Sequence, residues 1–172
     1  MEKELPVRKK IRLQGYDYST PGYYFVTVCV EDGHEMLGRI TVGATVPGRP
    51  CMELSEVGGC VDSAIKYYIT NNVINIDKYV IMPNHIHLII IIQSELGIQS
   101  ESGDRGRSPL QYKVRSLKSY ITKQIGYSMW QKSFYDEIIR NEEAYQNIWR
   151  YIDNNPAKWA EDDYYVKGIK IT

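Results

Sequence analysis

Two apolar runs separated by a turn dipeptide are the feature that most limits the folds open to this chain. Ile76–Met82 and His85–Ile92 are rich in β-branched residues, and Pro83-Asn84 lies between them. Proline fixes φ at a turn position, so the second run should return alongside the first. The longest purely apolar stretch, Leu88–Ile92, is far too short to span a bilayer. The sequence therefore predicts two strands of a sheet and no membrane span.

The other elements follow from apolar periodicity. Tyr23–Val30 has the composition of a buried strand, and Met36–Val42 is its expected partner strand. Apolar residues at helical spacing predict helices at Ser55–Ile69, Leu110–Ile125 and Asn141–Asn155. The last helix should end there because Pro156 disfavours helical geometry in the residue before it. The order β-β-α-β-β-α-α predicts an α+β fold, an antiparallel sheet with helices packed on it.

Length and composition are consistent with one globular domain over residues 1–172. Gly43–Pro50 and the Ser- and Gly-rich segment Gln93–Pro109 are predicted to be mobile loops. The charged start of the chain lacks the apolar core of a secretory signal. The three cysteines show no paired C-x-x-C spacing, which argues against a disulfide framework or a structural zinc site. We therefore expect a cytoplasmic protein without a membrane partner.

The histidine pair His85 and His87 carries the strongest chemical signal. Residues two apart on a strand point to the same face, so the two imidazoles can converge on one cation. The alternative is two polar residues on a solvated strand face, because an H-x-H pattern is short. Two histidines do not close a structural zinc site. An open site leaves room for water and for substrate oxygens, which suits a Lewis-acid metal acting on a phosphate.

The predicted last helix places a tyrosine and an amide side by side. Tyr151 and Asn155 are four residues apart and so are neighbours on one helix face. A phenol can serve as a nucleophile and an amide oxygen as a third metal ligand. The alternative is that Tyr151 only packs against the sheet, since periodicity does not distinguish it from Tyr120, Tyr135 or Tyr145.

The formal net charge of +0 conceals an uneven distribution. The segment from Arg105 to Lys132 contains no acidic residue. Its basic residues are the candidate DNA contacts, namely Arg105, Arg107, Lys113, Arg115, Lys118, Lys123 and Lys132. Such a segment can follow a nucleic-acid backbone, and Trp130 and several tyrosines among these cations offer planes on which unpaired bases can stack. An ordinary solvated helix face with core aromatics explains the same pattern.

Several stretches together resemble the HUH single-tyrosine transposases, specifically the REP-associated tyrosine transposases. They are Gly15-Tyr-Asp-Tyr-Ser through Tyr24-Phe-Val-Thr-Val-Cys, Met82-Pro-Asn-His-Ile-His-Leu-Ile, Trp130-Gln-Lys, Tyr135-Asp-Glu-Ile-Ile-Arg-Asn and Arg150-Tyr-Ile-Asp-Asn-Asn-Pro-Ala-Lys-Trp. The resemblance implies a ferredoxin-like antiparallel sheet with helices packed on one face. It also implies a Mg²⁺ or Mn²⁺ ion held by His85, His87 and Asn155, although Gln is common at the last position.

The activity implied by this resemblance is cleavage and rejoining of single-stranded DNA at hairpin-bearing, REP-like sites. Tyr151 would attack the scissile phosphate and leave a 5′-phosphotyrosine and a free 3′-OH. Relatives of this kind are monomers or homodimers. Two other functions stay open: a DNA-binding module that no longer cuts, and a metal-dependent phosphodiester hydrolase that uses activated water.

Overall fold

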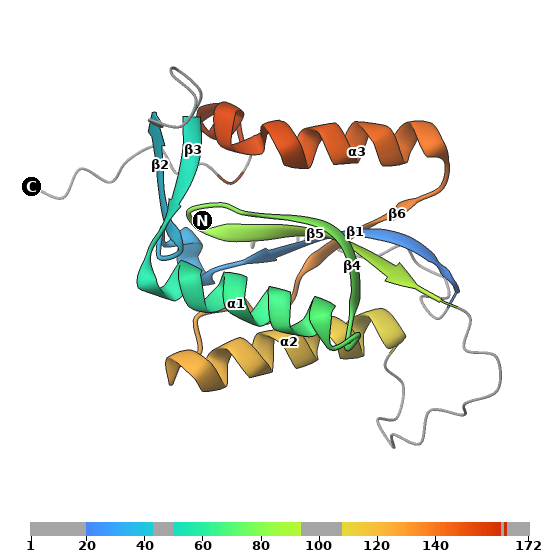
Figure 1. The fold of residues 1–172 in the computed structure, drawn as a ribbon, viewed down its shortest axis with the longest axis horizontal. Coiled ribbons are helices and arrows are strands. Elements are labelled where there is room, and N and C mark those ends of the chain that lie inside the picture. Colours follow the sequence, from blue (N-terminus) through green and yellow to red (C-terminus); the bar gives the residue numbers. More distant parts are fainter. Residues whose placement is uncertain (1–19, 43–49, 94–107, 163, 165–172) are drawn as a thin grey trace, which may run out of the picture.

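A four-stranded antiparallel sheet forms the centre of the molecule (Figure 1). The computed structural model describes residues 20–42, 50–93, 108–162 and 164. The spatial order of the strands is β4-β5-β1-β6. Their bounds are β1 (Gly22–Cys29), β4 (Asn75–Ile81), β5 (His85–Ile92) and β6 (Tyr135–Ile139). β4 and β5 pair antiparallel across Pro83-Asn84, so the hairpin predicted there is confirmed.

Helices cover both faces of this sheet. α1 (Glu56–Thr70) and α2 (Pro109–Ile125) pack on one face, and α3 (Glu142–Asn154) lies across the other (Figure 1). Apart from the β2–β3 hairpin and α3, the chain follows the β-α-β-β-α-β order of a ferredoxin-like fold. The α+β class and the antiparallel sheet are therefore confirmed. The expectation that the helices share one face holds only for α1 and α2.

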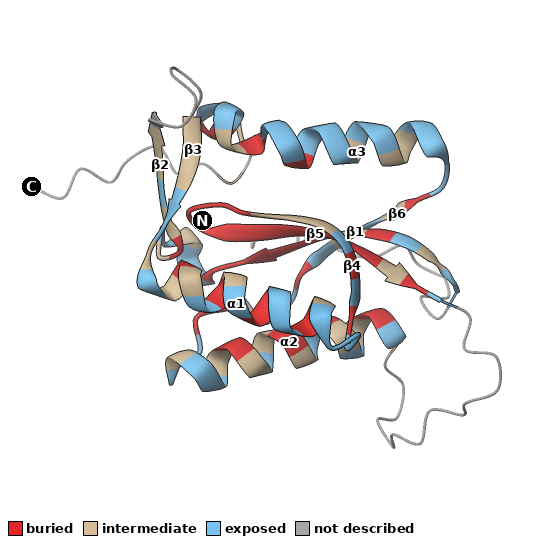
Figure 2. Cartoon of the chain, viewed as in Figure 1, coloured by how far each residue is buried: buried red, intermediate tan, exposed pale blue. Residues whose placement is uncertain are grey.

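The third helix occupies the second face because β5 is apolar on both sides. Ile86 and Leu88 belong to the larger core, which also contains residues of α1 and α2. Ile89 instead packs with Ile152 of α3 in a smaller core. Buried residues accordingly run through β5 almost without interruption (Figure 2). A strand with apolar side chains on both faces must be covered on both, and α3 supplies the second cover.

Each of the α-helices α1, α2 and α3 begins after a polar residue whose side chain accepts a backbone hydrogen bond, which satisfies an amide at the helix start. The capping residues are Ser55, Ser108 and Asn141. α2 ends at Gly126, which adopts a left-handed backbone conformation with φ of 85°. α3 ends at Asn154, close to the predicted end, but Asn155 keeps helical angles (φ −55°, ψ −46°) and the 3-10 helix η2 (Asn155–Glu161) follows directly.

The expected pairing of the first two strands is wrong. β2 (Gly38–Val42) pairs with β3 (Pro50–Leu54) in a separate two-stranded sheet, after the 3-10 helix η1 (Glu31–Gly33). β1 already has β5 and β6 as its two neighbours, so it has no free edge for β2. The sequence does not predict β3 or β6. Both are five-residue strands, and Asp136-Glu137 interrupts the apolar pattern of β6.

The two predicted loops fall mostly outside the described residues, which omit 43–49 and 94–107. At their ends, Pro50 begins β3 and Pro109 begins α2. Within the described part of the chain, no helix combines the length and the apolar character needed to cross a membrane.

Candidate active site

His85 and His87 lie on β5, on the face of the sheet that α3 covers. Both are buried, with 0% and 1% of their surface exposed. Their Nε2 atoms are 2.9 Å apart. The alternation of side chains along β5 places them with Ile89 and opposite Ile86, as the sequence predicts. The alternative reading, two polar residues on a solvated strand face, is wrong because α3 and the segment after it exclude water here.

The Nδ1 atom of each imidazole has a hydrogen-bond partner in the protein. His85 Nδ1 lies 2.8 Å from Asn84 Oδ1, and His87 Nδ1 lies 2.8 Å from Thr27 Oγ1. Thr27 is directly across from His87 in the β1–β5 pairing. Partners of this kind fix the orientation of imidazole rings that bind metals, so both Nε2 atoms are directed to one place.

Tyr151 lies in the last turn of α3, above the same two strands. Its hydroxyl is 3.3 Å from His87 Nε2, and its side chain is 42% exposed. Phe25 of β1 stacks on His87 with a centroid separation of 5.0 Å and meets Tyr151 edge-on at 6.0 Å. Ile152, the next residue, is 1% exposed and anchors the helix in the smaller core. The structure therefore brings the predicted tyrosine to the predicted histidines.

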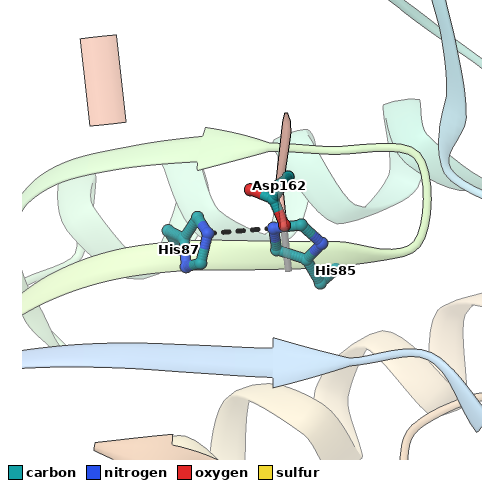
Figure 3. Close-up of side chains that lie close together, drawn as sticks. All are labelled: His85, His87 and Asp162. Atoms are coloured by element: carbon teal, nitrogen blue, oxygen red, sulfur yellow. Dashed lines mark hydrogen bonds between the residues drawn. The ribbon is translucent and has the colours of Figure 1, made fainter. Parts of the chain in front are cut away.

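Asp162 is the member of the site that the sequence does not predict. One ligand atom each from His85, His87 and Asp162 lie within 4.8 Å of one another (Figure 3). Asp162 Oδ2 accepts a hydrogen bond from the Tyr151 hydroxyl at 3.1 Å. Asp162 comes directly after η2, in a run of acidic residues without periodicity. No local pattern points to it, because only the turn of the chain after Pro156 brings it back to the histidines.

Asn155, the predicted third ligand, is 2% exposed and lies beside this carboxylate. Its Nδ2 donates to Asp162 Oδ2 at 3.1 Å. Its Oδ1 is buried and has no hydrogen-bond partner among the described residues. A buried polar atom without a partner is unfavourable by about 1–3 kcal/mol. A cation, or a water bound to one, would satisfy it, so this atom fits a place near a metal.

Burial sets the protonation of the histidines. Loss of water lowers the pKa of His85 to about 4, and the nearby carboxylate of Asp162 offsets part of that effect. Burial, together with the neighbouring His85, lowers the pKa of His87 well below its ordinary value. Both rings are therefore neutral at physiological pH, which is the form that binds a metal ion.

The donor atoms fit a divalent cation. Two imidazole nitrogens and one carboxylate form a three-ligand set, and the unsatisfied amide oxygen of Asn155 is an additional oxygen donor. A set this small leaves coordination positions for water and for phosphate oxygens. The chemistry it allows is polarisation of a phosphodiester next to the Tyr151 hydroxyl.

The basic residues expected to contact DNA do not gather at this site. Arg105 and Arg107 lie outside the described residues. Lys113, Arg115, Lys118 and Lys123 belong to α2, which packs on the opposite face of the sheet from α3 (Figure 1). A strand of DNA bound at Tyr151 would therefore have the sheet between it and these residues.

Lys118 and Trp130 have structural roles instead. Nζ of Lys118 donates to the carbonyl oxygens of Gln131 and Lys132, and partial burial lowers its pKa. Trp130 is 5% exposed and belongs to the larger core. The prediction that an unpaired base stacks on Trp130 is therefore wrong, because its side chain is buried in the larger core. Lys132 and Lys123 are exposed.

Three comparisons place the chain among known proteins. The sequence model of IS200-like transposases matches residues 52–155, more than half of the chain. An uncharacterized protein of Haemophilus influenzae is 32% identical over 183 aligned residues, covering 92% of this chain and 93% of that protein. A REP-associated tyrosine transposase bound to a REP hairpin has a similar structure, with a TM-score of 0.60.

That structural match covers 86% of this chain and 74% of the other, and at 21% identity it shows a common fold. The transposase resemblance carried by the sequence motifs is thus confirmed by independent comparisons. By the match to the family model, the chain belongs to the IS200-like transposase family.

Proposed function

We propose that this protein cuts and rejoins single-stranded DNA through a covalent 5′-phosphotyrosine on Tyr151, with a divalent metal. Membership of the transposase family supports strand transfer as the reaction class. The observation that carries the proposal is the position of the Tyr151 hydroxyl, 3.3 Å from His87 Nε2 and 3.1 Å from Asp162 Oδ2. A nucleophile in contact with two residues of a metal-ligand set can attack a phosphate held by the same metal.

The protein's own groups account for the nucleophile and its proton. Tyr151 donates its hydroxyl hydrogen toward Asp162, so this carboxylate is placed to accept the proton as the phenolic oxygen attacks phosphorus. A new bond forms between Tyr151 and the 5′-phosphate, and the bond to the 3′-oxygen breaks. The proton passes from Asp162 through water to the departing 3′-oxygen, which leaves as a free 3′-OH. The reverse attack by a 3′-OH rejoins a strand without an external energy source.

His85, His87 and Asp162 would hold the metal, with Asn155 beside them. When bound, Mg²⁺ or Mn²⁺ supplies Lewis-acid polarisation of the scissile phosphate. The two imidazole nitrogens favour Mn²⁺ over Mg²⁺, because Mg²⁺ prefers oxygen ligands.

The proposed substrate is single-stranded DNA that carries a hairpin. The structurally similar REP-associated transposase is bound to a REP hairpin, which supports this substrate class here. We place the cleaved strand on the α3 face, where Tyr151 is 42% exposed. The exposed cations Lys123 and Lys132, together with Lys113 and Arg115 on α2, are then left for contacts with DNA remote from the cleaved bond.

A trapping experiment tests the proposal. The protein is incubated with end-labelled, hairpin-bearing single-stranded DNA and Mn²⁺, and the products are separated under denaturing conditions. We expect a protein–DNA adduct that EDTA prevents and that Tyr151→Phe abolishes while DNA binding persists. Tyr145→Phe is the matched control, because Tyr145 is on the same helix but its hydroxyl bonds Asp77 instead of the histidines.

Other outcomes identify the rival functions. Cleavage without an adduct, unaffected by Tyr151→Phe, would indicate a hydrolase that uses activated water. Binding without cleavage of any hairpin substrate would indicate a module that no longer cuts.

A further inference from the structure

Asn84, the residue before the first histidine, is held in one orientation. It is 2% exposed, and its Nδ2 donates to two backbone carbonyls, of Gly33 at 3.2 Å and of Tyr164 at 2.8 Å. A flipped amide would place Oδ1 against both carbonyl oxygens, with no hydrogen between any of them. The amide orientation is therefore fixed, and Oδ1 must face His85.

This orientation determines the tautomer of His85. Asn84 Oδ1 can only accept a hydrogen bond, and it lies 2.8 Å from His85 Nδ1. The proton of the neutral ring must then be on Nδ1. Nε2 of His85 is left as a bare lone pair directed into the site, in the form a metal ligand requires.

His87 is not fixed in the same way. Since Nε2 of His85 carries no proton, the 2.9 Å contact between the two Nε2 atoms needs the proton of His87. In the metal-free protein, His87 therefore carries its proton on Nε2, and its Nδ1 accepts from the Thr27 hydroxyl at 2.8 Å. A hydroxyl can donate or accept, so Thr27 can serve either tautomer of His87.

We infer that Asn84 is a positioning residue that presets His85 as a metal ligand, whereas Thr27 lets His87 exchange its tautomer when the metal binds. During binding, the proton on His87 Nε2 passes to water. Nδ1 takes up a proton from water, and the new N–H donates a hydrogen bond to Thr27 Oγ1. The ring stays neutral and no net proton is released. The inference rests on the proposed function only in taking a divalent metal as the ion that the site binds.

Nitrogen-15 NMR of the histidine rings tests this directly in wild-type protein. With EDTA, we expect His85 to be protonated on Nδ1 and His87 on Nε2. With Zn²⁺ as a diamagnetic probe, His87 should move its proton to Nδ1 while His85 keeps its pattern. His34→Gln assigns the third ring. A proton on Nε2 of His85 without metal, or an identical change in both rings, would overturn the inference.

Metal affinity tests the role of Asn84. Asn84→Asp keeps an acceptor for His85 Nδ1 but places an oxygen against the Gly33 and Tyr164 carbonyls, whereas Asn84→Ala removes the acceptor. Both variants should lower the melting temperature. Only Asn84→Ala should raise the Kd for Mn²⁺, by about tenfold or more. Equal Mn²⁺ affinity in a folded Asn84→Ala, or equal losses in both variants, would contradict the inference.

Thr27 and a core control complete the design. Thr27→Ser should bind Mn²⁺ as the wild type does, and Thr27→Val should bind more weakly, because only serine keeps a hydroxyl. Ile86→Val, between the histidines but in the opposite core, should change stability without changing Mn²⁺ affinity. If Asn84→Ala does not fold, the inference is tested by the wild-type NMR pattern and by the Mn²⁺ affinities of Thr27→Ser and Thr27→Val. If the wild type shows the expected NMR pattern but forms no DNA adduct, the proposed reaction fails and this inference stands.

Discussion

The hydroxyl of Tyr151 lies 3.3 Å from Nε2 of His87, although 64 residues separate the two in the sequence. β5 and the last turn of α3 meet because Ile152 is buried in the core that Ile89 of β5 helps to form. Phe25 fills the space beneath the tyrosine and stacks on His87. The packing of α3 on the sheet therefore sets the distance between nucleophile and metal ligand.

The carboxylate of Asp162 should be needed to bind the metal. We expect Asp162→Asn to raise the Kd for Mn²⁺ by at least about tenfold, because it replaces an anionic ligand with a neutral one of the same shape. Isothermal titration measures the effect. Glu161→Gln is the control, since it removes the same charge from an exposed neighbour. Equal affinities of the two variants would remove Asp162 from the ligand set.

Asn155→Asp should make the stability of the fold depend more strongly on metal. Nδ2 of Asn155 donates to Asp162 at 3.1 Å, so the substitution sets two carboxylates against each other. The melting temperature without metal should fall, and Mn²⁺ should raise it by more than in the wild type. Asn154→Asp, an exposed change at the end of the same helix, should not respond in this way. A similar Mn²⁺ response in both variants would contradict a place for residue 155 near the ion.

The metal-free protein should lose stability as the pH falls below about 6.5. The folded pKa of His85 is lowered from 6.5 to about 4, and that of His87 is lowered as well. The unfolded chain therefore takes up protons that the folded chain excludes. This contribution to the free energy of unfolding is complete above pH 6.5. Between pH 6.5 and about 4 it declines by about 1.4 kcal/mol per pH unit for each such imidazole.

Denaturant unfolding in EDTA at a series of pH values measures this slope. His85→Gln should make this slope shallower between pH 6.5 and 5, because the unfolded chain then takes up one proton fewer relative to the folded chain. His34→Gln, which removes an exposed imidazole, is the control. A slope that His85→Gln leaves unchanged would show that acid unfolding has another origin.

Sequence reasoning succeeds here where a local repeat carries the information. The period of two on β5 places His85 and His87 on one face. The spacing of four across the end of α3 brings Tyr151 and Asn155 to the same partner, the carboxylate of Asp162. The predicted start and end of α3 are correct to within a residue, although Asn155, the residue before Pro156, keeps helical backbone angles. The family motifs identify Tyr151 among the tyrosines, which periodicity alone does not.

What the sequence misses depends on contacts between distant segments. Asp162 is brought to the site by η2, which no periodic pattern in the sequence marks. β2 pairs with β3 because β1 is already flanked on both sides, which is a property of the whole sheet. Trp130 lies among basic residues in the sequence, yet its side chain points into the core. Residues that are close in the sequence therefore need not lie on the same surface of the folded protein.

The adjacent glycines of α1 should respond oppositely to alanine. A Cβ on Gly58 would lie 1.9 Å from the carbonyl oxygen of Leu37, whereas nothing lies within 4 Å of one on Gly59. We expect Gly58→Ala to lower the free energy of unfolding by about 1–3 kcal/mol. Gly59→Ala should raise it by about 0.5–1 kcal/mol, because alanine is the better helix former. Denaturant titration of both variants checks the close approach of Leu37 to α1, and a stabilising Gly58→Ala would disprove it.

Two lysines of α2 should separate a structural role from a surface role. Lys118 donates to the carbonyls of Gln131 and Lys132, so Lys118→Ala should lower the free energy of unfolding by about 1–3 kcal/mol. Lys123 is exposed, and Lys123→Ala should change it by less than about 0.5 kcal/mol. Neither change should slow adduct formation at saturating protein, because α2 and Tyr151 are on opposite faces of the sheet. Slower single-turnover formation in Lys123→Ala would instead place α2 against the cleaved strand.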